Sequence, residues 1–219
     1  MQAIERNIGY TFKNKELLEV ALTHSSRHVS SVNNERLEYL GDAVLELIIS
    51  EYLFKNQKFS EGKMTKVRAN IVCAESLSQA AMDLKLGEYI LLGKGELVTG
   101  GRHRKSNLAN AFEAVMGAVF LDSNYETAKE VVLRALEKNI VLALKGRLVK
   151  DYKTELQEQI QKDGDNTLAY VLDREEGPEH NKTFYINLLY KGEVVSQGMG
   201  KSKKEAEQNA AKKYLFGDE

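Results

Sequence analysis

The chain has 219 residues, 42% hydrophobic and 29% charged, a balance typical of a soluble globular protein with one large or two smaller domains. It has no apolar run near the ~18–20 residues that span a membrane and no signal-peptide pattern at its start, so we expect a cytoplasmic protein without membrane contact. One cysteine excludes an internal disulfide, and a net charge of −1 means that nucleic-acid binding would need local clusters of charge.

Hydrophobic periodicity predicts that the first part of the chain is all-α. The segments with a helical pattern are 14–22, 33–57, 64–84 (in one piece or two), 107–122 and 125–144. Residues 93–107 contain four glycines and are predicted to form a loop.

The pattern changes after about Lys150, where β-rich runs lie between two helical segments. The predicted order is helix, three strands, helix, at 153–164 (ended by its glycine), 168–177, 182–190, 193–200 and 202–216. Lys191–Gly192 is predicted as the last hairpin turn, and Ser202 as the cap of the last helix. The fold class is therefore multidomain. An all-α domain at 1–146 is followed by a linker at 147–150 and a small α+β domain at 151–219, whose helices share one face of the sheet.

Four acids in the segment 33–47 fall on one side of its predicted helix. At ~100° per residue they lie within ~80° of one another; they are Glu35, Glu38, Asp42 and Glu46. The aliphatic residues, Leu47 among them, fall on the opposite side. A solvated face explains such a stripe. A metal site is the alternative, because closely spaced acids repel one another and a cation relieves that repulsion.

Two further features favour the metal site. Gly41 inside the helix costs ~1 kcal/mol relative to alanine, which indicates close packing at that point. In the helix predicted at 107–122, Asn110 and Glu113 are three residues apart and share a face. Packed against the acidic stripe, they would complete an oxygen-rich cage of the kind that Mg²⁺ prefers. Glu61 is a weaker candidate for a supporting role.

Several motifs resemble those of the ribonuclease III family. NERLEYLGDAVL (34–45) resembles the family signature, and SNLANAFEAVMGAVFLD (106–122) is similar to its second acidic motif. ALTHSS (21–26) and EGKMTKVRANIV (61–72) also resemble family segments. Residues 151–219 resemble the double-stranded-RNA-binding domain that follows the nuclease domain in bacterial members, so the resemblance covers essentially the whole chain.

The resemblance implies an endonuclease that hydrolyses phosphodiester bonds of double-stranded RNA in the processing of ribosomal RNA precursors and other transcripts. It implies products with 5′-phosphate and 3′-hydroxyl ends and short 3′ overhangs. It also implies Mg²⁺ as the cofactor, with Mn²⁺ as a substitute and no other small-molecule cofactor. Family members act as homodimers through the signature helix, which places Leu37, Leu40 and Gly41 at the expected interface.

Carried over residue by residue, the resemblance implies Asp42 and Glu113 as catalytic residues and Glu38, Asn110 and Glu113 as metal ligands. Asp42 would orient or deprotonate the attacking water, and Glu35 would belong to the same acidic cluster in a peripheral role. Asn110 departs from the family, which has an aspartate there. An asparagine keeps a coordinating carbonyl oxygen but loses the negative charge, so we expect reduced activity.

The C-terminal domain carries lysines in and before the first turn of its last predicted helix, at Lys201, Lys203 and Lys204. Lysine there opposes the helix dipole, which suggests an anion partner, whereas a solvated cluster is the alternative for these lysines taken alone. The resemblance adds Gln157, Glu158 and His180 as residues that would face the RNA minor groove. In the first domain, the basic residues of the loop at 93–107 are expected to guide the duplex; they are Arg102, Arg104 and Lys105.

Three functions are compatible with these features. The first is a Mg²⁺-dependent endonuclease on double-stranded RNA. The second is a double-stranded-RNA-binding protein whose nuclease centre is weak or dead because of Asn110. The third is a metal-dependent phosphohydrolase on a small substrate, which would leave residues 151–219 unexplained.

Overall fold

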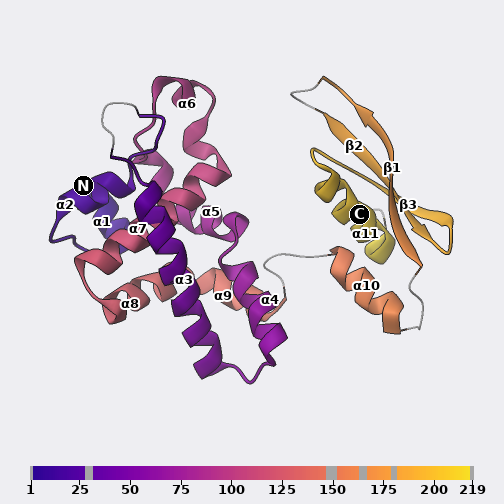
Figure 1. Cartoon of the computed structure of the whole chain (residues 1–219), viewed down its shortest axis with the longest axis horizontal. Helices are drawn as coiled ribbons and strands as arrows, with labels where there is room; N and C mark the ends of the chain where they lie inside the picture. Colours follow the sequence, from indigo (N-terminus) through magenta and orange to yellow (C-terminus); the bar gives the residue numbers. More distant parts are fainter. Residues whose placement is uncertain (1, 28–31, 147–151, 163–166, 179–181, 218–219) are drawn as a thin grey trace. The chain divides into compact units, whose positions relative to one another are not determined.

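The structure, a computed structural model, describes residues 2–27, 32–146, 152–162, 167–178 and 182–217. The chain divides into two compact units, Met1–Val149 and Lys150–Glu219 (Figure 1). The linker predicted at 147–150 lies outside the described residues. Each unit has a hydrophobic cluster of its own, and the predicted fold class, a helical domain followed by a small α+β domain, is confirmed.

The N-terminal unit is helical. Its elements are α1 (Gln2–Ile8), α2 (Lys15–Ala21), α3 (Glu35–Asn56), α4 (Glu61–Ile71), α5 (Ala74–Asp83), η1 (Leu86–Glu88), α6 (Lys94–Val98), η2 (Gly101–His103), α7 (Lys105–Asp122), α8 (Tyr125–Ala135) and α9 (Glu137–Leu144). Helix α3 begins where the Asn33 side chain accepts a hydrogen bond from the Glu35 backbone N–H, at 3.0 Å. In the described ranges, no helix is long and apolar enough to cross a membrane.

Two predictions about the helices need correction. The loop predicted at 93–107 contains α6 and η2, because the Glu96 carboxylate accepts from Arg104 at 2.5 Å and from Asn107 at 2.8 Å. These bonds tie the segment to the start of α7, which glycine content alone does not reveal. The helix predicted at 125–144 is two helices, with the break at Leu136, which is fully buried.

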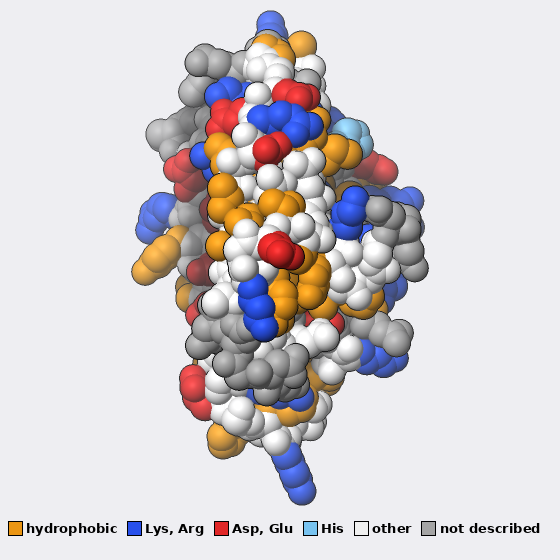
Figure 2. All heavy atoms as spheres, turned by 90° about the vertical axis from the view of Figure 1, so that its right-hand side faces the viewer, with side chains coloured by type: hydrophobic (Ala, Val, Ile, Leu, Met, Phe, Trp, Pro, Cys, Tyr) orange, Lys and Arg blue, Asp and Glu red, His pale blue; other side chains and the backbone are white. Residues whose placement is uncertain are grey.

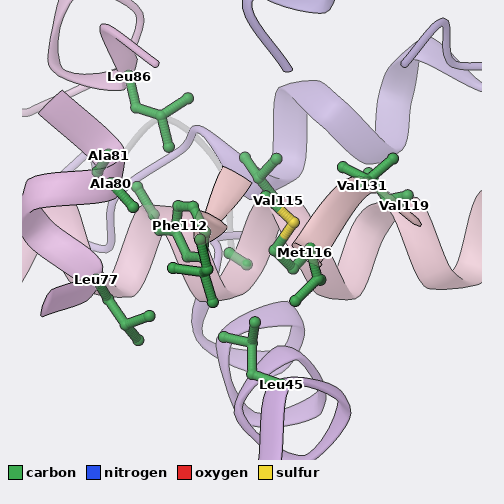
Figure 3. Packing of buried hydrophobic residues seen from close by; sticks show 14 of the residues in the cluster. Leu45, Leu77, Ala80, Ala81, Leu86, Phe112, Val115, Met116, Val119 and Val131 are labelled. Atoms are coloured by element: carbon green, nitrogen blue, oxygen red, sulfur yellow. The ribbon is translucent and has the colours of Figure 1, made fainter. Parts of the chain in front are cut away.

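Helix α7 runs through the centre of the N-terminal unit and is buried almost all round. Phe112, Val115 and Met116 on α7 are inaccessible to solvent and lie among Leu45 of α3 and Leu77 of α5 (Figure 3). Because small and aliphatic residues lie on every side of α7, neighbouring helices can pack around it. This packing fixes α7 beside α3.

Glycines allow α3 and α7 to pack with their backbones in close contact. A Cβ atom at Gly41 would lie 1.8 Å from the Glu113 carbonyl oxygen, and one at Gly117 would lie 2.5 Å from the Leu37 carbonyl oxygen. The close contact predicted at Gly41 is therefore real, but its partner is α7 of the same chain. This crossing sets Glu38 and Asp42 on α3 beside the polar side of α7.

The C-terminal unit has the predicted order, with α10 (Tyr152–Lys162), β1 (Leu168–Glu176), β2 (Thr183–Tyr190), β3 (Glu193–Gly200) and α11 (Lys203–Phe216). The strands form an antiparallel sheet in the order β1-β2-β3. Both helices cover one face of this sheet, and the core between them contains Leu156, Ile160, Leu188, Ala210 and Ala211 (Figure 1).

Two predicted turn features of the C-terminal unit are confirmed. Lys191 and Gly192 both have positive φ, 53° and 86°, as a two-residue hairpin with a type I′ turn requires. The Ser202 side chain accepts a hydrogen bond from the Glu205 backbone N–H at 3.2 Å and so caps α11. The cap leaves the first turn of α11, with Lys203 and Lys204, exposed at the end of β3.

Candidate functional site

Helices α3 and α7 bring the predicted catalytic and metal-binding residues together. Glu38 and Asp42 lie one turn apart on α3, and Asn110 and Glu113 lie one turn apart on α7. Glu38, Asn110 and Glu113 are half-buried, whereas Asp42 is exposed. The Asn110 side chain is hydrogen-bonded to the Glu38 carboxylate. The site is thus a set of acids along a helix crossing, with one side open to solvent.

The carboxylates of this site strongly affect one another. Burial, together with the charges of Asp42 and Glu38, raises the pKa of Glu113 to about 7. Burial and the charge of Glu35, together with that of Asp42, raise the pKa of Glu38, against the lowering effect of the Asn110 hydrogen bond. Ionising Glu38 and Glu113 near neutral pH therefore costs free energy, and a cation bound nearby would offset this cost.

The donor set fits a hard divalent cation, since three carboxylates and an amide carbonyl offer only oxygen ligands. Within the described ranges, no group of three or more His, Cys, Asp or Glu side chains is arranged so that it could hold a metal ion as it stands. Ligation would therefore require side-chain rotations on α3 and α7. The residues suit a divalent cation because their ligand atoms are all oxygens and because the carboxylates repel one another when no cation is bound.

The two supporting acids lie in different places. Glu35 is exposed in the first turn of α3 and acts electrostatically on Glu38. Glu61 begins α4, beside the C-terminal half of α3, and its carboxylate accepts a hydrogen bond from Thr65 at 3.0 Å. It lines a pocket with residues Leu47 to Phe54 of α3, which at ~1.5 Å per residue lie roughly 13–24 Å along the helix from Glu38. The structure therefore does not bring Glu61 to the acidic cluster of its own chain.

The residues predicted for a dimer interface are only partly accessible. Gly41 is buried against Glu113, and Leu37 belongs to the core while also lining the groove beside Leu40, so their contact with a partner stays a prediction. Leu40 is half-buried at a groove of about 960 Å³. Beside it Tyr39 is 82% exposed. The groove is lined by Leu17, Val20, Val32, Asn33, Glu35, Arg36, Leu37, Tyr39, Leu40 and Leu121.

Sequence reasoning missed Tyr39, although a signal was present. At ~100° per residue Tyr39 falls on the acidic side of the helix, where an aromatic ring has no core to enter. Leu47 is the opposite case, because its place on the aliphatic side of the predicted helix indicates burial, whereas its side chain is 58% exposed. The buried side of α3 is rotated from the predicted one, because α7 packs over Gly41.

The basic loop of the N-terminal unit is largely engaged within the fold. Arg102 donates to the carbonyl oxygens of Gly87 and Glu88 at 2.8 and 2.9 Å. Arg104 pairs with Glu96, and Lys105 pairs with Glu75 at 2.6 Å. These side chains hold the loop against neighbouring elements, and their availability for RNA is lower than the sequence suggested.

In the C-terminal unit, the predicted RNA-binding residues lie on the helices and their flanks. Gln157 is exposed on α10, which also carries Glu158, and His180 lies outside the described residues. Lys201 donates to the Thr183 hydroxyl at 3.1 Å just before α11, and Lys203 and Lys204 are exposed in its first turn.

The face of this unit that Figure 2 shows mixes hydrophobic patches with scattered charges of both signs. The whole domain has 14 acidic and 10 basic residues, so attraction for an anion must come from a local group of lysines.

Comparison with known proteins agrees with both units. Residues 14–140 match the family described as Ribonuclease-III-like, and residues 152–215 match the Double-stranded RNA binding motif. The chain is 49% identical over 219 residues to Ribonuclease 3 of Pelotomaculum thermopropionicum, covering 97% of this chain and 91% of that protein. It is 48% identical over 219 residues to Ribonuclease 3 of Clostridium tetani, covering 98% and 93%.

A solved structure supports the fold of the N-terminal unit. It is the crystal structure of the nuclease domain of ribonuclease III from Campylobacter jejuni, with 46% sequence identity and a TM-score of 0.60. The match covers 64% of this chain and 95% of that chain. A second structure of that nuclease domain (TM-score 0.61, 46% identity, 63% and 96% covered) concerns flexibility in a region involved in dimer formation. The acidic helix crossing, the αβββα unit and these similarities together show that the chain belongs to the ribonuclease III family.

Proposed function

We propose that this protein is a Mg²⁺-dependent endonuclease that cuts double-stranded RNA in the processing of ribosomal RNA precursors and other transcripts. The observation that carries the proposal is the convergence of Glu38, Asp42 and Glu113 at the α3–α7 crossing, where burial, together with the charges of Asp42 and Glu38, raises the pKa of Glu113 to about 7. A double-stranded RNA binding motif in the same chain accounts for the substrate. A phosphohydrolase on a small substrate would not need that second unit.

Membership of the family implies a divalent metal ion. Mg²⁺ suits the all-oxygen donor set best, with Mn²⁺ as a substitute. Glu38 and Glu113 would hold the ion, with the Asn110 carbonyl oxygen as a neutral third ligand. When bound, the ion supplies positive charge beside a scissile phosphate that the carboxylates alone would repel.

Asp42 is suited to handle the attacking water, because it is exposed at the edge of the half-buried cluster. Its carboxylate orients the water or accepts its proton. The water oxygen then forms the new bond to phosphorus while the bond to the 3′ oxygen breaks. The products are a 5′-phosphate and, once the 3′ oxygen takes up a proton, a 3′-hydroxyl.

Cutting both strands of a duplex needs two such centres, and we propose that a homodimer supplies them. The apolar groove and the exposed Tyr39 lie side by side on one chain. A two-fold axis pairs a surface with itself, so each Tyr39 can enter the groove of the other chain. This arrangement adds Tyr39 to the predicted contact residues, keeps Leu37 and Leu40 at the groove, and keeps α3 as the interface helix. Two centres offset across the duplex would leave short 3′ overhangs.

We propose that the C-terminal unit binds the duplex through Gln157, Glu158 and His180 together with the lysines flanking α11. Exposed lysines in a capped first turn add their charge to that of the free N–H groups of the helix. Such a unit reads the shape of A-form RNA more than its sequence. The cytoplasmic location expected from the sequence stays a prediction.

The test is to incubate the full chain with a labelled RNA duplex, with Mg²⁺ or with EDTA. We expect cleavage with Mg²⁺ only, and binding without cleavage in EDTA. The double variant Glu38→Gln with Glu113→Gln should still bind the duplex without cutting it. Binding without cleavage at any Mg²⁺ or Mn²⁺ concentration would favour the alternative, an RNA-binding protein with a dead centre. Neither binding nor cleavage would refute both.

A further inference from the structure

A carboxylate at the end of β1 lies between Lys203, which belongs to the proposed RNA-binding surface, and Lys182, which precedes β2. Glu175 Oε2 accepts a hydrogen bond from Lys182 Nζ at 2.9 Å, and Glu175 Oε1 lies 3.8 Å from Lys203 Nζ. Glu175 is paired across the sheet with Phe184, whose ring centroid lies 5.9 Å from Lys203 Nζ. One acid thus links the start of β2 to the first turn of α11.

Neither lysine is deeply buried. The Lys182 side chain is 39% exposed and that of Lys203 is 58% exposed, while that of Glu175 is 31% exposed. The tight hydrogen bond from Lys182 and the looser pair with Lys203 lower the pKa of the Glu175 carboxyl, so this group is ionised at neutral pH. Its charge therefore offsets part of the positive charge that an RNA phosphate would meet.

We propose that Glu175 is a built-in competitor of the RNA phosphates, which occupies Lys182 and Lys203 in the free protein and weakens duplex binding. The inference rests on the proposed RNA-binding role of Lys203. A phosphate that approaches Lys203 must displace the carboxylate or bind next to it, and both cost affinity. The 3.8 Å separation leaves Lys203 free to swing toward a phosphate, whereas Lys182 is held more firmly.

Competition from Glu175 gives the protein a moderate affinity for duplex RNA, so that the RNA dissociates readily. An enzyme that must release its products gains from a binding surface that is not maximally positive, because electrostatic affinity is independent of sequence and slows release from every duplex. The carboxylate also keeps the lysines in place before RNA arrives. Glu175 is thus a residue that tunes affinity through its neighbours.

The test is duplex binding by the full chain in EDTA, with Glu175→Gln compared with the parent on a blunt RNA duplex of about 20 base pairs. Glutamine keeps the size of the side chain and an acceptor for Lys182 but removes the charge. We expect about three- to fivefold tighter binding at low salt, the range of an exposed ion pair. We also expect the salt dependence to steepen by up to about one unit.

The chain offers a matched control in the next residue. Glu176 belongs to the same strand, but its carboxylate pairs with Arg174 and accepts a hydrogen bond from the Tyr185 hydroxyl. Glu176→Gln makes the same charge change away from the two lysines and should alter affinity by less than about twofold. An equal gain in both variants would overturn the proposal, because bulk charge would then explain the effect.

A third variant separates this inference from the proposed function. Lys203→Gln should weaken binding in the parent and weaken it further in the Glu175→Gln background, where Lys203 has lost its competitor. If Lys203→Gln weakens binding but Glu175→Gln fails to strengthen it, the inference is wrong and the RNA-binding face stands. If Lys203→Gln has no effect in either background, Lys203 does not bind RNA, and both the inference and that part of the proposed function fail.

Discussion

Asn110 is the uncharged member of the proposed metal-ligand set, whose other members, Glu38 and Glu113, are carboxylates. It lies one turn before Glu113 on α7 and is hydrogen-bonded to the Glu38 carboxylate. As an amide it adds no charge to a site where burial and repulsion already raise the pKa of Glu113 to about 7. The neutral side chain therefore spares the folded protein a further repulsion, at the expense of attraction for a cation.

Asn110→Asp is expected to raise the cleavage rate at low Mg²⁺ and to leave RNA affinity in EDTA nearly unchanged. The same variant should unfold more readily without metal, because a fourth carboxylate joins the cluster. Single-turnover cleavage across a Mg²⁺ titration measures the first effect, and thermal unfolding in EDTA measures the second. Asn56→Asp, at the exposed end of α3, adds the same charge elsewhere and serves as the control. Superimposed titration curves would mean that asparagine is an adequate ligand.

Glu113 makes metal-free stability depend on pH. Its pKa is raised from 4.5 to about 7 on folding, so the folded state holds the proton more tightly than the unfolded state. The contribution of this proton to the free energy of unfolding is fully present below about pH 4.5. It is lost as the pH rises through about 7, where Glu113 ionises in the folded protein. Glu113→Gln should therefore be the more stable form at pH 8, by roughly 1–3 kcal/mol, with little difference at pH 4.5.

Urea unfolding in EDTA at both pH values checks this expectation for Glu113. Glu130→Gln, on the exposed side of α8, should differ from the parent equally at the two pH values. A divalent ion should restore the stability of the parent at pH 8 and have a smaller effect on Glu113→Gln. If the difference in stability between Glu113→Gln and the parent did not change with pH, the pKa of Glu113 would not be raised on folding.

At the scale of elements, the crossing of α3 and α7 determines whether a site exists. The two helices can bring their acids together only because Gly41 and Gly117 let the backbones touch. Any side chain at Gly41 would collide with the Glu113 backbone, which belongs to a fully packed helix and cannot move by itself. The helix that carries half of the ligands would have to shift.

Gly41→Ala is therefore expected to destabilise the protein by about 3 kcal/mol or more, although alanine is the better helix former. Gly62→Ala is the matched control, since Gly62 is also helical but has no atom within 4 Å of the added Cβ. That variant should be stabilised by about 0.4–1 kcal/mol. Urea unfolding of both variants gives the comparison, and a Gly41→Ala protein as stable as the parent would contradict the close crossing.

At the scale of the whole molecule, the groove beside Tyr39 is the surface best suited to a second copy. Tyr39→Ala should raise the dimer dissociation constant about tenfold or more, as the loss of a central aromatic contact does. Sedimentation over a dilution series measures it. Val98→Ala, at an 87% exposed residue on α6, should leave the assembly unchanged. A Tyr39→Ala dimer as tight as the parent would exclude this interface. The proposal that a dimer formed through this groove supplies the second catalytic centre would then fail.

Features that depend on short-range patterns could be predicted from the amino-acid sequence. Hydrophobic period, turn residues and caps act within a few positions, so the helical first part, the αβββα order, the turn at Lys191–Gly192 and the Ser202 cap could all be predicted. The acidic stripe on α3 and the pair on α7 were also visible, because residues three and four apart share a helix face. Motif resemblance then joined the two stripes into one candidate site.

Tertiary structure decided everything that depends on which distant segments touch. Which acids become half-buried, and hence the raised pKa values of Glu38 and Glu113, follows from how closely α7 approaches α3. The partner of Gly41, the isolation of Glu61 and the exposure of Tyr39 follow from the same packing, because a helical pattern leaves the direction of its buried side open by tens of degrees. Burial and repulsion arise between residues far apart in the chain, and no local pattern encodes their distance.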